Sequence, residues 1–331
     1  MADAIWITEA EVVQLMDLKE AIAALEVALR EEARGEAQNM TKTLLQYGKN
    51  NLHAIGAKLG SLVGTKTWTH TQGGTCPLLL LWSAEDGSLA AVIEAFALGN
   101  LRTGGISGVA ADWMAKKDAR VMALAGTGKQ ALAQVGTMLA VRPIERLQVY
   151  SPRPESRGEF AKKVREEFAL DAVACASAEE ACKGAHIVTL VTRASQPFVT
   201  AGMLERGAHL NAVGAIAPDR EEFAQDVFDR ATRVAVDNLP GVQQLSREFM
   251  TRCASRGWDE VLPLSKLVAQ GQRRGDSDDI SLFKAMGMGI SDLALGAELV
   301  RRARERGVGR AIPQPKKTQP RLATTRAKSS V

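Results

Sequence analysis

The chain has 331 residues, of which 46% are hydrophobic and 24% are charged, and its formal net charge is +4. This is the composition of a globular protein, and the length is sufficient for two domains. No apolar run approaches the about 20 residues that a membrane helix needs. The opening MADAIWITEAEVVQLM lacks the basic-then-apolar order of a signal peptide. We therefore expect neither a membrane span nor a secretion signal.

Cysteine and histidine usage constrains the compartment and the chemistry. The four cysteines are scattered and form no CxxC pair, which favours reduced thiols and a cytoplasmic location. The four histidines show no HxxxH spacing, so we expect no metal site.

The C-terminal segment differs from the rest of the chain. Residues 315–331, PKKTQPRLATTRAKSSV, hold five basic residues and no acidic one. A segment this polar is expected to be a disordered, solvated tail. Its charge accounts for the positive net charge of the whole chain, so binding to nucleic acid or to a membrane surface is the weaker interpretation.

The first third of the chain changes pattern twice. Residues 8–36 predict a helix, because apolar residues recur every three or four positions. Strands are predicted in TKTLLQY, LHAIGAKL, VGTKTWTHT and PLLLLWSAEDGSLAAVIEA, within residues 40–95, with a hairpin turn at EDG. Residues 103–116 predict a Gly- and Ala-rich helix whose small side chains allow close packing by another element.

From residue 120 onward, strands and helices alternate. The candidate strands are residues 120–125, 146–151, 171–176, 186–192, 208–214 and 232–237. This order predicts an α/β fold with a doubly wound parallel sheet. Residues 240–310 look mostly helical, and DDISLFKAMGMGISDLALGAELVRRARERG predicts a long helix that returns toward the first domain.

A glycine-containing loop lies in VMALAGTGKQALAQVGTM, residues 121–138. Gly126 suits a tight turn, Gly128 lets the backbone approach a pyrophosphate, and Ala131 lets the helix pack on the strand. The helix N-terminus favours negative charge. The sequence therefore predicts dinucleotide binding by the loop residues Gly126, Thr127, Gly128, Lys129, Gln130 and Ala131. The alternative is an ordinary strand-to-helix turn.

The end of the second strand of this unit indicates which dinucleotide is bound. An NAD site usually places Asp or Glu there, whereas VYSPRPESR offers Ser151, Arg153 and Arg157. A hydroxyl and guanidinium groups suit a 2′-phosphate. We predict that NADPH is preferred over NADH. The alternative is that the two arginines only form a solvated helix start.

Several basic residues of the first domain lie on or beside apolar segments, namely Lys42, Lys58, Lys66 and Arg102. A reductase of amino-acid-like substrates must hold a carboxylate, and these residues are the candidates. Taken alone, a lysine in a strand is more often a solvated or edge-strand charge.

The order of motifs resembles the ornithine cyclodeaminase/mu-crystallin family. The matching pieces span roughly residues 40–300 and are VGTKTW, LLLLWSAEDGSLAAVIEA, LRTGG, ALAGTGKQA, HIVTLVTRASQP, HLNAVGAIAPDREEF, VAVDN and DDISLFKAMGMGISDLA. The resemblance implies a homodimer formed through the N-terminal domain. It also implies a Rossmann domain at residues 118–299 and a discontinuous α/β substrate and dimerisation domain at residues 1–117 and about 300–314, with the substrate between them.

The resemblance also assigns roles to individual residues. Lys66 and Arg102 are expected to face the substrate, and Lys42 is expected to help hold its carboxylate. Three residues at the carboxyl ends of sheet strands, Thr192, Val213 and Gly214, are expected to shape the nicotinamide pocket, as the rule for ligands at a topological switch point predicts.

One position departs from the family pattern. Ornithine cyclodeaminases carry a catalytic aspartate in a G-x-D-x-P-G-K segment, but this chain reads VGAIAPDREEF and has Ile216 there. Isoleucine cannot relay a proton, although Asp219 is left as a possible substitute. We therefore expect NADPH-dependent reduction of an α-imino acid to an L-amino acid. The imino acid is a cyclic ketimine, such as pyrroline- or piperideine-2-carboxylate, or an imine of a keto acid and an amine.

Other functions stay open at this point. One is an ornithine or lysine cyclodeaminase, a second is an amino-acid dehydrogenase working in the reverse direction, and a third is a non-enzymatic, NADPH-binding protein like some crystallins.

Overall fold

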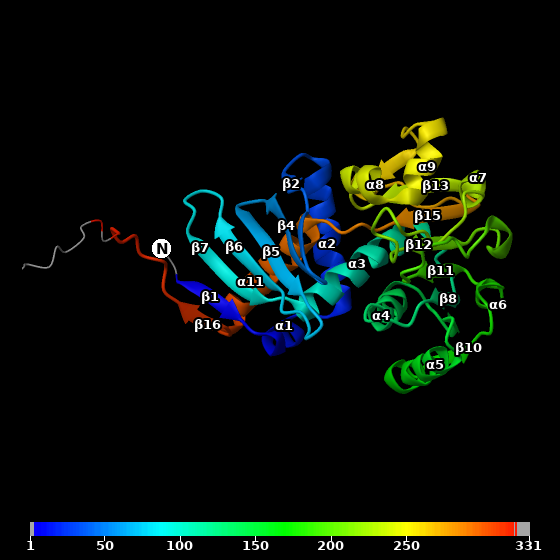
Figure 1. Cartoon of the computed structure of the whole chain (residues 1–331), viewed down its shortest axis with the longest axis horizontal. Coiled ribbons are helices and arrows are strands. Elements are labelled where there is room, and N and C mark those ends of the chain that lie inside the picture. The colour runs from blue at the N-terminus through cyan, green and yellow to red at the C-terminus, as the bar shows by residue number, and fades with distance from the viewer. Residues whose placement is uncertain (1–2, 321, 323–331) are drawn as a thin grey trace, which may run out of the picture.

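The computed structural model describes residues 3–320 and residue 322. Residues 315–320 carry no helix or strand, and the rest of the predicted tail lies outside the described residues, apart from residue 322. Two eight-stranded sheets organise the described part of the chain, and they lie at opposite ends of the elongated molecule with helix α3 (Phe96–Met114) between them (Figure 1).

The first sheet is mostly antiparallel and has the order β16-β1-β7-β6-β5-β4-β2, with β3 paired to β4. Its strands are β1 (Ala4–Ile7), β2 (Ala37–Asn39), β3 (Thr43–Tyr47), β4 (Asn50–Leu59), β5 (Leu62–His70), β6 (Leu78–Ser83), β7 (Leu89–Glu94) and β16 (Arg310–Ile312). The predicted hairpin at EDG is confirmed, because it joins the antiparallel strands β6 and β7.

The predicted helix over residues 8–36 is wrong as a single element. It is two helices, α1 (Glu9–Leu15) and α2 (Leu18–Ala33), separated by Met16 in an extended conformation. Asp17 accepts a hydrogen bond from the amide of Glu20, and the Glu20 side chain accepts one from the amide of Asp17. This capping box starts a new helix within an otherwise continuous apolar pattern.

The second sheet is entirely parallel, with the order β10-β9-β8-β11-β12-β15-β13-β14. Its strands are β8 (Val121–Ala125), β9 (Arg146–Tyr150), β10 (Asp171–Ala174), β11 (Ile187–Leu190), β12 (His209–Ala212), β13 (Ala231–Val236), β14 (Val261–Pro263) and β15 (Ile280–Lys284). All six predicted strands are present. The order reverses between β8 and β11, which is the topological switch point of a Rossmann sheet.

Helices of the second unit connect these strands. They are α4 (Ala131–Val141), α5 (Pro154–Phe168), α6 (Ala178–Cys182), α7 (Val227–Arg230), α8 (Leu239–Leu245), α9 (Arg247–Arg256), α10 (Leu264–Ala269) and the 3₁₀ turn η1 (Ala201–Met203).

The long helix predicted from DDISLFKAMGMGISDLALGAELVRRARERG is wrong in its first part. Residues 280–284 form β15, with all five residues buried between β12 and β13. A short strand buried on both faces has no alternation that distinguishes it from a helix. The helix is α11 (Gly289–Arg306), which packs on β4 and β5 of the first sheet. The chain therefore returns to the first unit at about residue 289, and the boundary predicted at residues 299 and 300 lies inside α11.

Helix α3 joins the two units through its small residues. It starts at Phe96, earlier than predicted, and it carries Arg102 in its second turn. A Cβ on Gly104 would lie 2.6 Å from Thr137 Oγ1 of α4, and one on Gly105 would lie 2.6 Å from Leu25 Cδ1 of α2. The predicted close approach of another element is therefore confirmed. Among the described residues, no helix combines the length and apolar character required to cross a bilayer.

Candidate functional site

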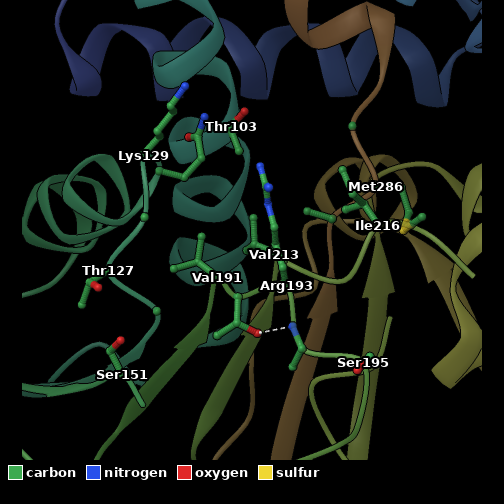
Figure 2. Close-up of a pocket in the computed structure, with 18 of the residues that line it drawn as sticks. Thr103, Thr127, Lys129, Ser151, Val191, Arg193, Ser195, Val213, Ile216 and Met286 are labelled. Carbon is green, nitrogen blue, oxygen red and sulfur yellow. Dashed lines mark hydrogen bonds between the residues drawn. The ribbon is translucent and has the colours of Figure 1, made fainter. Parts of the chain in front are cut away.

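A cavity of about 1000 Å³ lies between the carboxyl ends of the second sheet's central strands and the first unit. Figure 2 shows Thr127, Lys129 and Ser151 at one side, Ile216 and Met286 at the other, and Thr103 of α3 across from the strand ends. The predicted site residues that line it are Lys42, Arg102, Gly126, Thr127, Gly128, Lys129, Gln130, Ser151, Arg153, Thr192, Val213 and Gly214. Lys66, Ala131 and Arg157 lie outside its lining.

The glycine loop has the backbone geometry that a dinucleotide requires. Gly126 has φ +106°, and a Cβ there would lie 2.6 Å from the carbonyl oxygen of Val191. Only glycine fits this position without strain. A Cβ on Gly128 would meet no atom within 4 Å, so that side of the loop is open for a ligand to approach the backbone.

The helix that follows the loop is open at its N-terminus. No side chain caps the first turn of α4, although the Ala131 amide donates to the carbonyl oxygen of Gly128 at 3.0 Å. The helix dipole at this uncapped end favours an anion. Ala131 is fully buried in the core beneath this turn. The Gln130 side chain donates to Asn100 Oδ1 at 3.0 Å, which ties the loop to α3. The loop and helix therefore fit the diphosphate of a dinucleotide.

At the end of β9, the three residues predicted to select NADPH separate into two roles. Ser151 is buried and Arg153 is exposed, and both line the cavity. Arg157 instead donates through Nη1 to the carbonyl oxygen of Ser151 at 3.0 Å, which fixes the turn between β9 and α5. No carboxylate occupies this strand end, where SPR follows β9.

Lys66 is held by a residue that sequence reasoning missed. Its Nζ lies 2.5 Å from Asp292 Oδ1 of α11, and the two side chains are 4% and 0% exposed. The pKa of Lys66 is lowered to about 8, chiefly by burial and then by the cation of Arg102, while Asp292 acts in the opposite direction. The sequence does contain a signal that could have identified it, since Asp292 is a lone charged residue within the apolar stretch GISDLALG.

Arg102 and Lys42 complete a cationic cluster on the first unit. Arg102 Nε lies 3.4 Å from Asp292 Oδ1, and a Cβ on Gly287 would be 2.9 Å from Arg102 Nη1. Burial lowers the pKa of Lys42, and the Arg102 cation lowers it as well. Lys66 and Arg102 share one carboxylate and Lys42 adds a third positive charge, so the cluster keeps positive charge for a bound anion.

Glu222 was also missed, and it organises the strand ends that were predicted to shape the nicotinamide pocket. Its Oε1 accepts hydrogen bonds from Thr192 N at 2.6 Å and from Thr192 Oγ1 at 2.8 Å. Its Oε2 accepts from the amides of Gly214 at 2.9 Å and Ala215 at 3.0 Å. One buried carboxylate therefore joins the ends of β11 and β12. The sequence pattern offered no signal for this role.

At the position of the family aspartate, the side chain that lines the cavity is the apolar Ile216. Ile216 is 41% exposed. Asp219 does not line it, and its carboxylate lies 3.4 Å from Arg220 Nε with 72% of the side chain exposed. Asp237, unlike Asp219, does line the cavity. Its carboxylate accepts hydrogen bonds from the backbone amides of Met286 and Gly287, each at 2.8 Å. Burial raises the pKa of Asp237.

The arrangement is that of a two-sided binding site. One wall offers an uncapped helix N-terminus, an open glycine loop and cations suited to phosphates. The opposite wall offers a desolvated cationic cluster suited to a carboxylate. Among the described residues, no group of three or more His, Cys, Asp or Glu side chains is placed to hold a metal ion.

Comparisons with known proteins agree with this geometry. The model of the ornithine cyclodeaminase/mu-crystallin family matches residues 3–307. A Delta(1)-pyrroline-2-carboxylate reductase of Bacillus cereus is 28% identical, over 90% of this chain and 96% of its own. The Thermococcus litoralis Delta(1)-pyrroline-2-carboxylate reductase, solved with NADH and L-proline, has a TM-score of 0.85 at 25% identity, covering 93% of this chain and 100% of its own.

An archaeal alanine dehydrogenase dimer with bound NAD has a TM-score of 0.86 at 28% identity, covering 94% of this chain and 99% of its own. The likeness therefore extends over both units and not only over the dinucleotide-binding sheet. The chain belongs to the ornithine cyclodeaminase/mu-crystallin family.

Proposed function

We propose that this protein reduces an α-imino acid to an L-amino acid with NADPH. The observation that carries the proposal is the pairing of two features across one cavity. The open glycine loop at Gly126 and Gly128 lies on one side. Lys42 and Arg102 line the other side, and Lys66, which is outside the lining, is joined to Arg102 through the Asp292 carboxylate. We assign the cofactor side to residues 118–288, and the substrate side to residues 3–117 with α11 and β16.

Each cation has a role in this reaction. Arg102 and Lys42 hold the substrate carboxylate by charge-assisted hydrogen bonds. Lys66 supplies the proton for the imine nitrogen, because a pKa of about 8 leaves it mostly protonated at neutral pH yet able to donate. An imine accepts hydride more readily when it is protonated. The reduced nicotinamide, when bound, supplies that hydride.

Reduction fits the site better than cyclodeamination. A cyclodeaminase must oxidise the amine, release ammonia on ring closure and then reduce the cyclic imine, which requires a further acid or base at the substrate. Ile216 occupies the position of the family aspartate, and the exposed, Arg220-paired Asp219 does not line the cavity. We therefore place this chain with the ketimine reductases of its family.

The choice of NADPH over NADH is a separate part of the proposal. Ser151 and Arg153 support it, because they line the cavity at the strand end where an NAD site usually has a carboxylate. The two solved relatives described above contain NADH and NAD. Michaelis constants for NADH and NADPH decide the question, and a clear preference for NADH would overturn this part.

We also propose a homodimer, and two features of the first unit support it. Helix α11 lies behind β4, β5 and β6 in Figure 1, and no described helix covers the face turned to the viewer. The hairpin β3–β4 exposes large apolar side chains, namely Leu44, Leu45, Tyr47 and Leu52. Light scattering after size exclusion tests this, and a monomer at micromolar concentration would contradict it.

A cytoplasmic location is a separate part of the proposal, and it is supported by the four cysteines, which are all free thiols.

A substrate screen tests the activity directly. NADPH oxidation is followed with pyrroline- and piperideine-2-carboxylate, and with keto acids plus ammonia or methylamine. Ammonia release from ornithine and lysine is measured in parallel. Lys66→Ala should abolish turnover while NADPH binding persists. Lys58→Ala is the matched control, because Lys58 is an exposed lysine of the neighbouring strand β4 that donates to the carbonyl oxygen of Glu36, whereas Lys66 is buried and paired with Asp292.

The possible results of the screen separate the candidate functions. NADPH oxidation with an imino acid, lost in Lys66→Ala and retained in Lys58→Ala, supports the reductase. Ammonia release without net NADPH consumption would replace it with a cyclodeaminase. Tight NADPH binding with no turnover on any substrate of the panel would indicate a non-enzymatic binding protein.

A further inference from the structure

Arg193 is a cation in the cavity to which the proposed reaction assigns no role. It is the third residue after β11, the strand that pairs with β8, whose end carries the glycine loop. Figure 2 shows its side chain rising from the strand end and pointing across the cavity toward α3. It lies between Lys129 on one side and Ile216 and Met286 on the other.

The backbone beneath Arg193 is fixed from several directions. Thr192 is bound to the buried carboxylate of Glu222. The Arg220 side chain donates to the carbonyl oxygen of Arg193 at 2.5 Å, and the amide of Ala194 donates to Thr192 Oγ1 at 3.1 Å. The guanidinium therefore extends from a backbone that is fixed beside the cavity.

The guanidinium itself has no partner in the part of the chain that the structure describes. It forms no ion pair and donates no hydrogen bond there, whereas Lys66 and Arg102 share Asp292. An arginine offers several donors in a fixed planar fork that matches two oxygens of a phosphate. A fork that lines a cavity and lacks a carboxylate partner is available to an anionic ligand.

The position of Arg193 indicates which anion it serves. The substrate carboxylate already has Lys42 and Arg102. A 2′-phosphate belongs near Ser151 and Arg153 at the end of β9, on the other side of β8 from Arg193. The diphosphate lies between these two ends of a dinucleotide, over the glycine loop. We propose that Arg193 binds the diphosphate of the dinucleotide from the side opposite the glycine loop. The inference rests on the proposed dinucleotide binding and adds a residue to it.

Calorimetric binding tests this without relying on turnover. The ligands are NADPH, NADH, ADP-ribose, which keeps the diphosphate but lacks nicotinamide, and adenosine 2′-monophosphate, which has no diphosphate. Arg193→Gln should weaken NADPH, NADH and ADP-ribose by about tenfold or more and leave adenosine 2′-monophosphate unchanged. Arg153→Gln should weaken NADPH and adenosine 2′-monophosphate only. Arg193→Lys should restore part of the loss, because it keeps the charge without the fork.

A matched control is Arg304→Gln, because Arg304 is an exposed arginine of α11 outside the cavity. Unchanged affinity of Arg193→Gln for NADH and ADP-ribose would overturn the inference. Equal weakening of all four ligands would also overturn it, since that result reports a damaged fold. A raised KM for the imino acid with unchanged dinucleotide affinity would assign Arg193 to the substrate instead. Failure of the unmodified protein to bind any dinucleotide would refute the proposed function as a whole.

Discussion

Lys66 of β5 and Asp292 of α11 form a buried ion pair, with Nζ 2.5 Å from Oδ1, although 226 positions separate them in the chain. Arg102 Nε lies 3.4 Å from the same carboxylate oxygen. One negative charge therefore compensates two cations at the floor of the substrate side. A substrate carboxylate would neutralise the remaining positive charge. Asp292 therefore limits the electrostatic repulsion between the Lys66 and Arg102 cations when no substrate is bound.

Replacing Asp292 by Asn should move the pH dependence of catalysis. Asp292 raises the pKa of Lys66, against the lowering by burial and by Arg102, so its loss lowers that pKa below about 8. If protonated Lys66 is the proton donor, as proposed, kcat/KM of the parent should fall as pH rises through about 8. In Asp292→Asn this fall should occur at lower pH. Profiles of kcat/KM between about pH 6 and 10 measure the shift, and an unmoved basic limb would show that Asp292 does not control Lys66.

Breaking the buried pair from the lysine side should cost stability as well as activity. Lys66→Met leaves Asp292 buried with Arg102 as its remaining ion-pair partner, and removal of one partner of a buried pair costs about 3–5 kcal/mol. We expect the low end of this range because Arg102 stays. The double variant Lys66→Met/Asp292→Leu should regain most of the stability but none of the turnover. Urea unfolding and NADPH-oxidation assays measure the two effects, and activity in the double variant would exclude a chemical role for Lys66.

The two glycines of the loop should respond differently to the same substitution. Gly126→Ala places a Cβ at positive φ and 2.6 Å from the Val191 carbonyl oxygen, so it should lower the thermal unfolding temperature. Gly128→Ala adds a Cβ where no atom lies within 4 Å, so it should leave the unfolding temperature unchanged.

The two glycine variants should also differ in their affinity for the dinucleotide. Gly128→Ala should raise the Kd for NADPH strongly, since the added methyl occupies the side from which a diphosphate approaches. Thermal melts and calorimetry on both variants provide the comparison. Parental NADPH affinity in Gly128→Ala would mean that this side of the loop is not the binding face.

Cofactor choice should be reversible at the end of β9. Ser151→Asp supplies the carboxylate of an NAD-type site and repels a 2′-phosphate. Combined with Arg153→Gln, it should raise KM for NADPH by about tenfold or more and lower KM for NADH. Arg157→Gln serves as the control, because Arg157 bonds the Ser151 carbonyl and does not line the cavity. If the ratio of the two KM values changed more in Arg157→Gln than in the double variant, the assignment of the 2′-phosphate site would be wrong.

Local pattern was enough for much of the fold and for one half of the site. The six predicted strands of the parallel sheet follow from buried apolar runs that alternate with helices. The loop around Gly126 follows from requirements that act within a few residues of the chain. The pattern failed where a short buried strand, β15, has the same composition as the start of a helix. It also failed at Met16, where the capping box of Asp17 and Glu20 starts a new helix within a continuous apolar repeat.

The amino-acid order by itself predicted a glycine loop of the dinucleotide-binding type, and it determined the absence of a carboxylate directly after β9 and the replacement of the family aspartate by Ile216. These are properties of single positions in a known local context. Only the tertiary structure decided that Asp292 pairs with Lys66, that Glu222 joins the ends of β11 and β12, and that Arg193 points into the cavity with no partner among the described residues. The physical reason is that the charge and hydrogen bonding of a buried group depend on neighbours within a few ångströms, and folding brings those neighbours from distant parts of the chain.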